Sequence, residues 1–179
     1  EETPIEPAIE FSPASIDFGQ QVTGYTGSQK ITVSQQNVSG ITYGFGDTNT
    51  DNVFSFTSAT GTVTITANPT APGTYNATLT ATGNDTRAGH EGETTIGTLS
   101  VSISVGLQSP VLVGGSNLKN TYYLKWSIVP CATSYEIYEV NNGVQTLVTG
   151  IDVANDGTYI TRSVASTAAE KNYIVKAIG

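Results

Sequence analysis

Cysteine and histidine, the residues most often used as nucleophile and general base, each occur once in the chain, as Cys131 and His90. A cysteine becomes reactive when a positive neighbourhood or a histidine lowers the pKa of its thiol. Cys131 follows Pro130 in the stretch PCATS, whereas His90 belongs to a distant segment, RAGHEGE. The spacing offers no Cys–His pair, so we expect Cys131 to be a structural residue and assign no catalytic residue.

His90 also raises the question of a zinc site, because Glu91 and Glu93 follow it closely. Zinc in proteins is held by three or four histidine, cysteine or carboxylate ligands in a fixed geometry. One histidine and two glutamates in a glycine-containing loop do not make such a set. We therefore interpret RAGHEGE as a solvated loop.

The stretch DTNTDN has oxygen ligands at alternating positions, Asp47, Asn49 and Asp51, as a calcium loop does. Such a loop also has a glycine at its sixth position and a bidentate glutamate at its twelfth. Asn52 and Ser58 stand at these two positions. The stretch is better explained as an acidic turn, and we predict no metal.

Sequence motifs of other enzyme classes are missing as well. The chain contains no HExxH, no G-x-S-x-G turn and no phosphate-binding glycine loop before a helix. No pair of carboxylates is spaced for acid–base chemistry. We therefore predict that the protein is not an enzyme and needs no cofactor.

Composition and charge narrow the possible partners. Of the 179 residues only 12% are charged, and the net charge is −8. Residues 1–106 hold ten acids and two bases, which accounts for all of this charge, while residues 107–179 hold five of each. A chain with this charge repels nucleic acid and anionic lipid surfaces. No run approaches the roughly 18 apolar residues that a membrane-spanning helix needs.

Most of the chain alternates apolar and polar residues with period 2, which is typical of antiparallel strands with one buried face. In GTYNATLTATG, for example, Tyr75, Ala77 and Leu79 fall on one face. Glycine, asparagine and proline clusters separate these runs at short intervals. This spacing predicts an all-β fold built from β-sandwiches.

The pattern resets after Gly106, and Pro110 then restricts the next segment to an edge or linker conformation. We predict two tandem immunoglobulin-like β-sandwich domains, residues 8–106 and residues 107–179. Residues 1–7, acidic and proline-containing, are expected to form an N-terminal tether. The NNG triplet that ends at Gly143 predicts a hairpin, and STAAEKN is the one weak helical stretch.

Residues 107–179 resemble a fibronectin type III domain through LKW, ATSYEIY and NYIVKAIG. In that family a tryptophan and two tyrosines fill the core between the sheets. The resemblance implies that Trp126, Tyr135 and Tyr173 are core residues. Because Trp126 shares a face with Leu124 in the alternating pattern, a sugar-stacking role for this ring is disfavoured.

The resemblance departs from the family at the end of the sequence, where NYIVKAIG matches the sixth strand and no seventh is evident. The domain is truncated, or its edge is open, or the pattern hides one further strand. With Tyr173 and Val175 facing inward, Ile174 and Ile178 face outward together with Tyr138. We predict an interaction surface at Tyr138, Ile174 and Ile178, since an unprotected edge invites another strand. That strand belongs to a partner, to a neighbouring copy or to a C-terminal segment outside the sequence.

Residues 8–106 resemble the Hydin-type immunoglobulin-like repeats of bacterial surface proteins. The match rests on FSPASIDFGQQVTGYTGSQKITVS, in which Phe18-Gly19 ends an early strand, and on ANPTAPGTYNATLTATG. The second stretch includes Tyr75 at the corner before the sixth strand, which implies that Tyr75 is a core residue. The resemblance also implies an exported, extracellular or outer-membrane protein, with membrane contact only through an N-terminal lipid anchor outside the sequence.

The resulting functional hypothesis is a non-catalytic protein of the cell surface, acting in adhesion or as a structural spacer. Its expected partner is a protein or a glycan. The alternative is a glycan-binding accessory protein in carbohydrate uptake. That alternative requires an exposed strip of aromatic side chains, and the available residues are Tyr25, Tyr43, Tyr123 and Tyr138.

Overall fold

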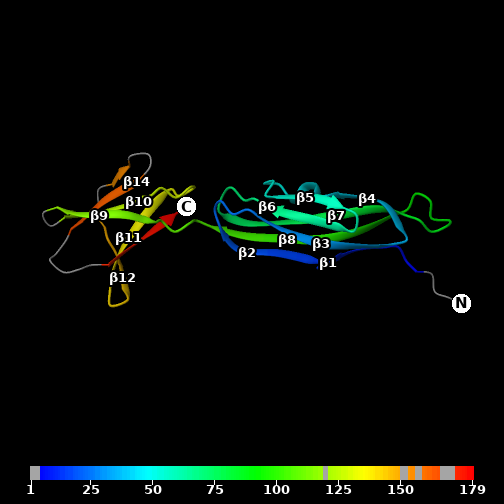
Figure 1. Cartoon of the computed structure of the whole chain (residues 1–179), viewed down its shortest axis with the longest axis horizontal. Helices are drawn as coiled ribbons and strands as arrows, with labels where there is room; N and C mark the ends of the chain where they lie inside the picture. Colours follow the sequence, from blue (N-terminus) through cyan, green and yellow to red (C-terminus); the bar gives the residue numbers. More distant parts are fainter. Residues whose placement is uncertain (1–4, 119–120, 150–152, 156–158, 166–171) are drawn as a thin grey trace. The chain divides into compact units, whose positions relative to one another are not determined.

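The computed structural model divides the chain into two compact units, residues 1–106 and residues 107–179 (Figure 1). The structure describes residues 5–118, 121–149, 153–155, 159–165 and 172–179. Strands dominate this part of the chain, and its only helix is a single 3-10 turn, Gly46–Thr48. None of the described residues forms a helix of the length and hydropathy needed to span a membrane.

Unit 1 is a sandwich of two four-stranded sheets. The first sheet has the order β1 (Ala8–Ser12), β3 (Gly27–Gln36), β6 (Thr62–Ala67), β5 (Phe54–Ala59). The second sheet has the order β2 (Ser15–Val22), β8 (Thr94–Gly106), β7 (Gly73–Asp85), β4 (Val38–Gly44). One four-stranded sheet with this crossed order, packed on a second sheet, is the immunoglobulin-like arrangement.

The alternating strands form because their apolar residues all fall on the inner faces of the two sheets. On β8, for example, Leu99, Val101 and Ile103 are at most 2% exposed, while the serines between them face outward. Nineteen hydrophobic residues of unit 1 are buried in one continuous core. Phe18 and Phe54 belong to this core and Phe45 packs against it, with ring centroids 6.3 Å apart for Phe18–Phe54 and for Phe54–Phe45.

Two details of β2 differ from the expected all-antiparallel pattern. The strand pairs with β8 in parallel, and its register shifts between Asp17 and Gln20. The prediction that Phe18-Gly19 ends a strand is wrong, because β2 continues to Val22 through this bulge. Gly19 makes the bulge possible, since its φ of +72° is a conformation that residues with a side chain rarely adopt.

Tyr75 closes the corner that leads into β7. Its hydroxyl donates a hydrogen bond to the backbone oxygen of Ala71, 2.9 Å away. A tyrosine at the start of this strand that bonds back to the preceding turn is the tyrosine corner of immunoglobulin-like sandwiches. Its ring is partly buried against the core of unit 1.

Unit 2 is a second sandwich, with a four-stranded and a three-stranded sheet among the described residues. The larger sheet has the order β13 (Val153–Asn155), β14 (Tyr159–Ala165), β10 (Thr121–Ser127), β9 (Leu112–Leu118). The smaller has the order β12 (Val144–Leu147), β11 (Ser134–Asn141), β15 (Asn172–Ile178). The expected all-β fold of two tandem immunoglobulin-like sandwiches is confirmed.

The core of unit 2 is small and is organised around Trp126. The indole is fully buried and meets the ring of Tyr135 edge-on, at 5.5 Å between centroids. The Tyr135 hydroxyl in turn accepts a hydrogen bond of 2.6 Å from the Val129 backbone N–H. Tyr173 is partly buried and packs against the same cluster.

Local turn chemistry fixes the register of β11 and β12. Asn142 and Gly143 both have positive φ, 49° and 81°, and they connect the paired residues Asn141 and Val144. This is the two-residue hairpin that asparagine followed by glycine favours, so the hairpin prediction is confirmed. Most of the stretch STAAEKN, the weak helical prediction, lies outside the described residues.

The strand count of unit 2 also differs from the expectation. NYIVKAI forms β15, which is the seventh described strand of the unit rather than the sixth. It nevertheless pairs only with β11 among the described residues and therefore stands at the edge of its sheet.

Candidate functional site

The surface predicted from the sequence assembles on the outer face of β11 and β15. Tyr138 and Ile174 are direct cross-strand partners, and Ile178 lies four residues further along β15 on the same face. Ile174 and Ile178 are 37% and 36% exposed, whereas Tyr138 is half-buried. We call Tyr138, Ile174 and Ile178, together with Glu136 and Lys176 between them, the β11–β15 face.

Lys176 and Glu136 order the tyrosine of this face, and the sequence pattern did not single them out. The Lys176 Nζ lies 4.3 Å from the centre of the Tyr138 ring, and the Tyr138 hydroxyl donates a 2.6 Å hydrogen bond to the Glu136 carboxylate. That hydrogen bond raises the pKa of the Tyr138 hydroxyl, with a further contribution from burial. The ring therefore contacts a cation over its face and the hydroxyl contacts a carboxylate.

The backbone of β15 has one side turned toward β11 and one side turned away. The Val148 N–H donates to the Ile137 oxygen, so the backbone groups of Ile137 point to β12. Because backbone groups alternate along a strand, those of Glu136 point to β15, where Lys176 is its partner. The N–H and C=O groups of Val175 and Ala177 then point to the opposite, outer edge of the sheet.

A groove of about 530 Å³ runs along this outer edge. One wall is the segment of residues 107–112 and the other is β15. Leu107, Pro110 and Leu112 face Val175 and Ala177 across it, and Lys176 is the only charged residue of the lining. The sequence pattern predicted the exposed edge but not this wall, because nothing local marks residues 107–112 as the neighbours of β15.

Exposed apolar side chains concentrate in unit 2. Of the twelve large hydrophobic residues that are most exposed in the described chain, nine belong to unit 2. Val111, Leu112 and Val113 form a continuous exposed run that adjoins the groove at Leu112, and Ile174 lines the groove from β15. A cluster of this kind is typical of a binding surface rather than of a free surface.

Cys131 lies in a tight turn whose backbone conformation requires a positive φ at this residue. It has a φ of +65° and follows Pro130, and the Ala132 N–H donates to the Val129 oxygen across the turn. Proline in the second position and positive φ in the third define a type II turn. The thiol is exposed, and the position of Cys131 is explained by the backbone conformation of this turn.

The loop that contains His90 was predicted to be solvated, but its histidine contacts two carboxylates. His90 Nδ1 lies 2.9 Å from the Glu93 carboxylate and 4.0 Å from that of Asp85, at the end of β7. Asp85, His90 and Glu93 offer ligand atoms within 4.8 Å of one another, while Glu91 instead accepts the Gly89 N–H. The sequence analysis did not select Asp85, because this residue lies in a strand and approaches His90 and Glu93 only when the loop after β7 is folded.

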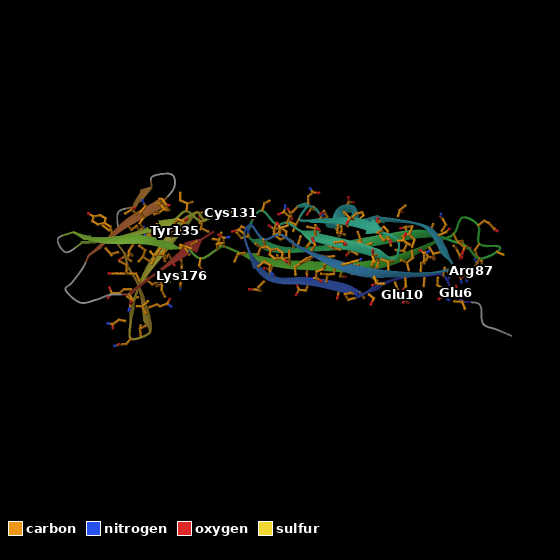
Figure 2. The ribbon with its side chains drawn as sticks, viewed as in Figure 1. Glu6, Glu10, Arg87, Cys131, Tyr135 and Lys176 are labelled. Atoms are coloured by element: carbon orange, nitrogen blue, oxygen red, sulfur yellow. The ribbon has the colours of Figure 1, made fainter. Side chains whose placement is uncertain are left out.

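Arg87 is the basic partner of Asp85 in this cluster. Its guanidinium donates to both oxygens of Asp85, at 2.9 to 3.2 Å, and its other end donates to Glu6 at 2.7 Å. Figure 2 shows Arg87 and Glu6 at the same end of unit 1. Both Asp85 oxygens are thus engaged by Arg87, and the residues of this cluster form a network of ion pairs.

The network also holds the first described residues of the chain on unit 1. Glu6 pairs with Arg87, and the oxygen of Ile5 accepts a 2.7 Å hydrogen bond from the Asn37 side chain. Residues 5 and 6, expected to belong to a tether, are thus attached to the sandwich.

The Asp85 carboxyl makes the stability of unit 1 depend on pH. The hydrogen bonds from Arg87 lower its pKa in the folded state, outweighing burial, which acts in the opposite direction. A lowered folded pKa stabilises the protein above the unfolded pKa of about 3.9, and this contribution is lost as the pH falls through the folded value. In urea unfolding followed by circular dichroism, Asp85→Asn should destabilise unit 1 at pH 7 and approach wild type at pH 2.5.

Glu6→Gln provides the matched control for Asp85→Asn, since Glu6 bonds the same guanidinium but its side chain is 76% exposed. It should change the unfolding curve much less at every pH. A difference between Asp85→Asn and wild type that stays constant from pH 7 to pH 2.5 would contradict the role assigned to this carboxylate.

The acidic turn of unit 1 is organised by its asparagine. The Asn49 side chain donates to the Phe54 oxygen at 2.7 Å and accepts from the Phe54 N–H at 3.2 Å. The Asn49 amide, which a calcium loop would use as a ligand, is therefore hydrogen-bonded to the backbone of Phe54, the first residue of β5.

The four tyrosines considered for glycan stacking are divided between the two units, two in each. Tyr25 and Tyr43 are partly buried against the core of unit 1, and burial raises the pKa of the Tyr43 hydroxyl. Tyr123, in unit 2, is 36% exposed on β10. Tyr138 belongs to the other sheet of that unit and is covered on one side by Lys176.

Comparisons with known proteins return structures but no sequence relatives. No protein-family model matches the chain, and no curated protein matches it significantly. The titin domains Z1Z2 in complex with telethonin are 11% identical, with a TM-score of 0.40 over 99% of this chain and 97% of that chain. The Ig1-2 module of the Drosophila receptor protein tyrosine phosphatase DLAR is 12% identical, with a TM-score of 0.30 over 89% and 92%. The immunoglobulin-like assignment rests on the strand order of the two units.

Proposed function

We propose that the chain is a non-catalytic, protein-binding part of an exported or cell-surface protein, acting in adhesion or as a structural spacer. The observation that carries this proposal is the β11–β15 face with its adjoining groove. It gathers exposed isoleucines, an ordered tyrosine and one lysine at a sheet edge, which is the composition of a protein-binding surface.

Three other candidate sites, the turn at Cys131, the Asp85–Arg87 network and the Asn49 turn, each have a structural explanation. Unit 1, which carries the whole net charge, supplies a rigid, acidic and soluble element next to the binding unit. The placement at a bacterial cell surface, with a lipid anchor outside the sequence, is supported only by the resemblance of residues 8–106 to Hydin-type repeats.

The proposal is tested with beads that carry the full chain and surfaces coated with a panel of purified extracellular and bacterial surface proteins. We expect adhesion to at least one coating, and we expect Ile174→Lys with Ile178→Lys to abolish it. Val22→Lys, which places a charge on an exposed apolar residue of unit 1, is the control and should adhere like wild type.

A glycan array distinguishes the proposed protein binding from the alternative function, glycan binding. Reproducible glycan binding that is lost in Tyr123→Ala or Tyr138→Ala, together with no adhesion to any protein coating, would replace the proposed function by glycan binding. Adhesion that survives the paired isoleucine substitutions would show that the β11–β15 face is not the binding surface.

A further inference from the structure

We infer that the open edge of β12 pairs with the same edge of a second copy of this chain, so that two copies of unit 2 join through one continuous sheet. The inference goes beyond the proposed function and does not depend on it, because it concerns the edge of the sheet opposite to β15. It rests on an exposed apolar edge and on the symmetry with which that edge complements itself.

The β11–β12 hairpin carries large apolar side chains that the rest of unit 2 leaves uncovered. Every residue from Asn141 to Leu147 is exposed. Val144 is 65% exposed, the largest value among the large hydrophobic residues of the described chain, and Leu147 is 44% exposed. Figure 1 shows the hairpin extending beyond the other strands of unit 2. Nothing in the described part of unit 2 covers these two side chains.

One hydrogen-bonding side of β12 is open. The Val148 N–H donates to β11, so the backbone groups two and four residues earlier also point to β11. The backbone groups of Gln145 and Leu147 point away from β11, and no described strand pairs with them. An edge of this kind is completed by another extended strand.

This edge lacks the usual devices that prevent strand addition. Edge strands are normally protected by charged residues, proline or a bulge. Residues 140–149 contain no charge and no proline, and β11 and β12 pair without a shift in register. β5, an uncharged edge strand of unit 1, differs because its exposed residues are only serine, threonine and alanine. The edge of β12 is thus open in its backbone and apolar in its side chains.

A second copy fits this edge because the edge is self-complementary. A two-fold axis at Thr146 pairs Gln145 of each copy with Leu147 of the other, and both residues have outward backbone groups. Each pair exchanges its N–H and C=O groups. On the inner side of the sheet, Val144 then lies opposite Val148 of the second copy, a residue that packs against the core of unit 2. The most exposed apolar side chain is thereby covered.

The charges of unit 2 permit this association. Residues 107–179 hold five acids and five bases, so the unit that carries the edge is neutral. Glu139 on β11 is the cross-strand partner of Thr146. Across the seam the two Glu139 residues are three strand spacings apart, about 14 Å, which exceeds the screening length of about 8 Å at physiological salt. Like charges therefore do not oppose the pairing.

The pairing has a consequence for binding. Antiparallel addition about a two-fold axis joins β15-β11-β12 of each copy into one sheet with the same face outward in both. Both β11–β15 faces then lie on one side, so a dimer engages a repeated partner at two points. The seam itself consists of one strand of four residues from each copy. This is less than a standard interface of about 1,600 Å², so we expect a weak, reversible dimer.

Sedimentation equilibrium of the full chain tests the dimer. We expect a monomer at about 5 µM and a dimer fraction that grows up to about 1 mM, the range of a weak interface. Leu147→Pro removes an outward N–H from each copy without touching the bonds to β11, and it should weaken self-association about tenfold or more. Ala177→Pro removes an outward N–H at the opposite edge of the same sheet and is the matched control, expected to dimerise like wild type.

Disulfide trapping tests the register. In a Cys131→Ser background, which removes the only native thiol, Thr146→Cys places the two thiols on opposed residues with Cα atoms about 4.5 Å apart, within disulfide range. A glutathione buffer should trap this variant as a covalent dimer. Val144→Cys is the matched control, because its side chain is also exposed but the axis at Thr146 sets the two copies of residue 144 about 13 Å apart along the strands.

Three results would overturn the inference. They are a monomer at every concentration, equal self-association of Leu147→Pro and wild type, and no more cross-linking for Thr146→Cys than for Val144→Cys. A dimer lost in Ala177→Pro but kept in Leu147→Pro would also overturn it, because the copies then meet at the edge of β15. None of these outcomes affects the proposed function, whose bead adhesion assay uses substitutions on the β11–β15 face.

Discussion

Replacement of Trp126 by alanine is expected to lower the free energy of unfolding of unit 2 by about 3–5 kcal/mol, the usual cost of deleting a buried aromatic ring. The ring is fully buried, and its edge-on contact with Tyr135 would be lost together with the cavity it fills. Because domains of this size have total stabilities of about 5–15 kcal/mol, the loss is a large fraction of the stability of unit 2.

The small size of the unit 2 core is the reason for this sensitivity. Eight buried hydrophobic residues form its described core, against nineteen in unit 1. The remaining seven residues cannot close around a missing indole without moving strands in both sheets. In unit 1 a single deletion of equal size would leave most of the core contacts in place.

The measurement for Trp126→Ala is a two-dimensional amide spectrum of the full chain during urea titration. The resonances of unit 2 should collapse at low urea, while those of unit 1 keep their wild-type midpoint. Ile128→Ala is the matched control, because Ile128 is 38% exposed and should cost less than 1 kcal/mol. Equal midpoints for Trp126→Ala and wild type would show that the indole does not anchor the core.

Sequence reasoning succeeded where the structure depends on neighbours in the chain. Alternation fixed the buried faces of strands such as β8, because the side-chain period of a strand leaves one assignment of inside and outside. The Asn142-Gly143 hairpin and the corner at Tyr75 were likewise predictable, since each depends on residues within a few positions of one another.

Several features that sequence reasoning missed depend on residues distant in the chain. The parallel pairing of β2 with β8 joins segments more than eighty positions apart, and nothing within either segment specifies it. The Asp85–Arg87–Glu6 network needs the N-terminal segment to meet the β7–β8 loop. The groove beside β15 needs residues 107–112 as its second wall. Alternating patterns identify strands, but the choice of partner strands is a property of the whole fold.

Substitution of Gly97 by alanine is expected to destabilise unit 1 by about 1–3 kcal/mol, as overpacking of a core does. Gly97 is a buried residue of β8, in register with Ala81 on β7. An added Cβ would fall on the backbone oxygen of Ile9 and 3.0 Å from two of its side-chain carbons. A backbone oxygen cannot rotate away, so β1 must move as a whole, and shortening Ile9 should not rescue the variant.

Trp126 supplies the measurement, because it is the only tryptophan and belongs to unit 2. In Gly97→Ala, urea unfolding followed by circular dichroism should shift to lower denaturant, while the transition followed by tryptophan fluorescence should stay at its wild-type midpoint. Gly106→Ala is the matched control on the same strand, since the nearest atom to its added Cβ is the Gln21 oxygen at 4.0 Å. If both glycine variants unfold at the wild-type midpoint, β1 and β8 do not approach as closely as the structure places them.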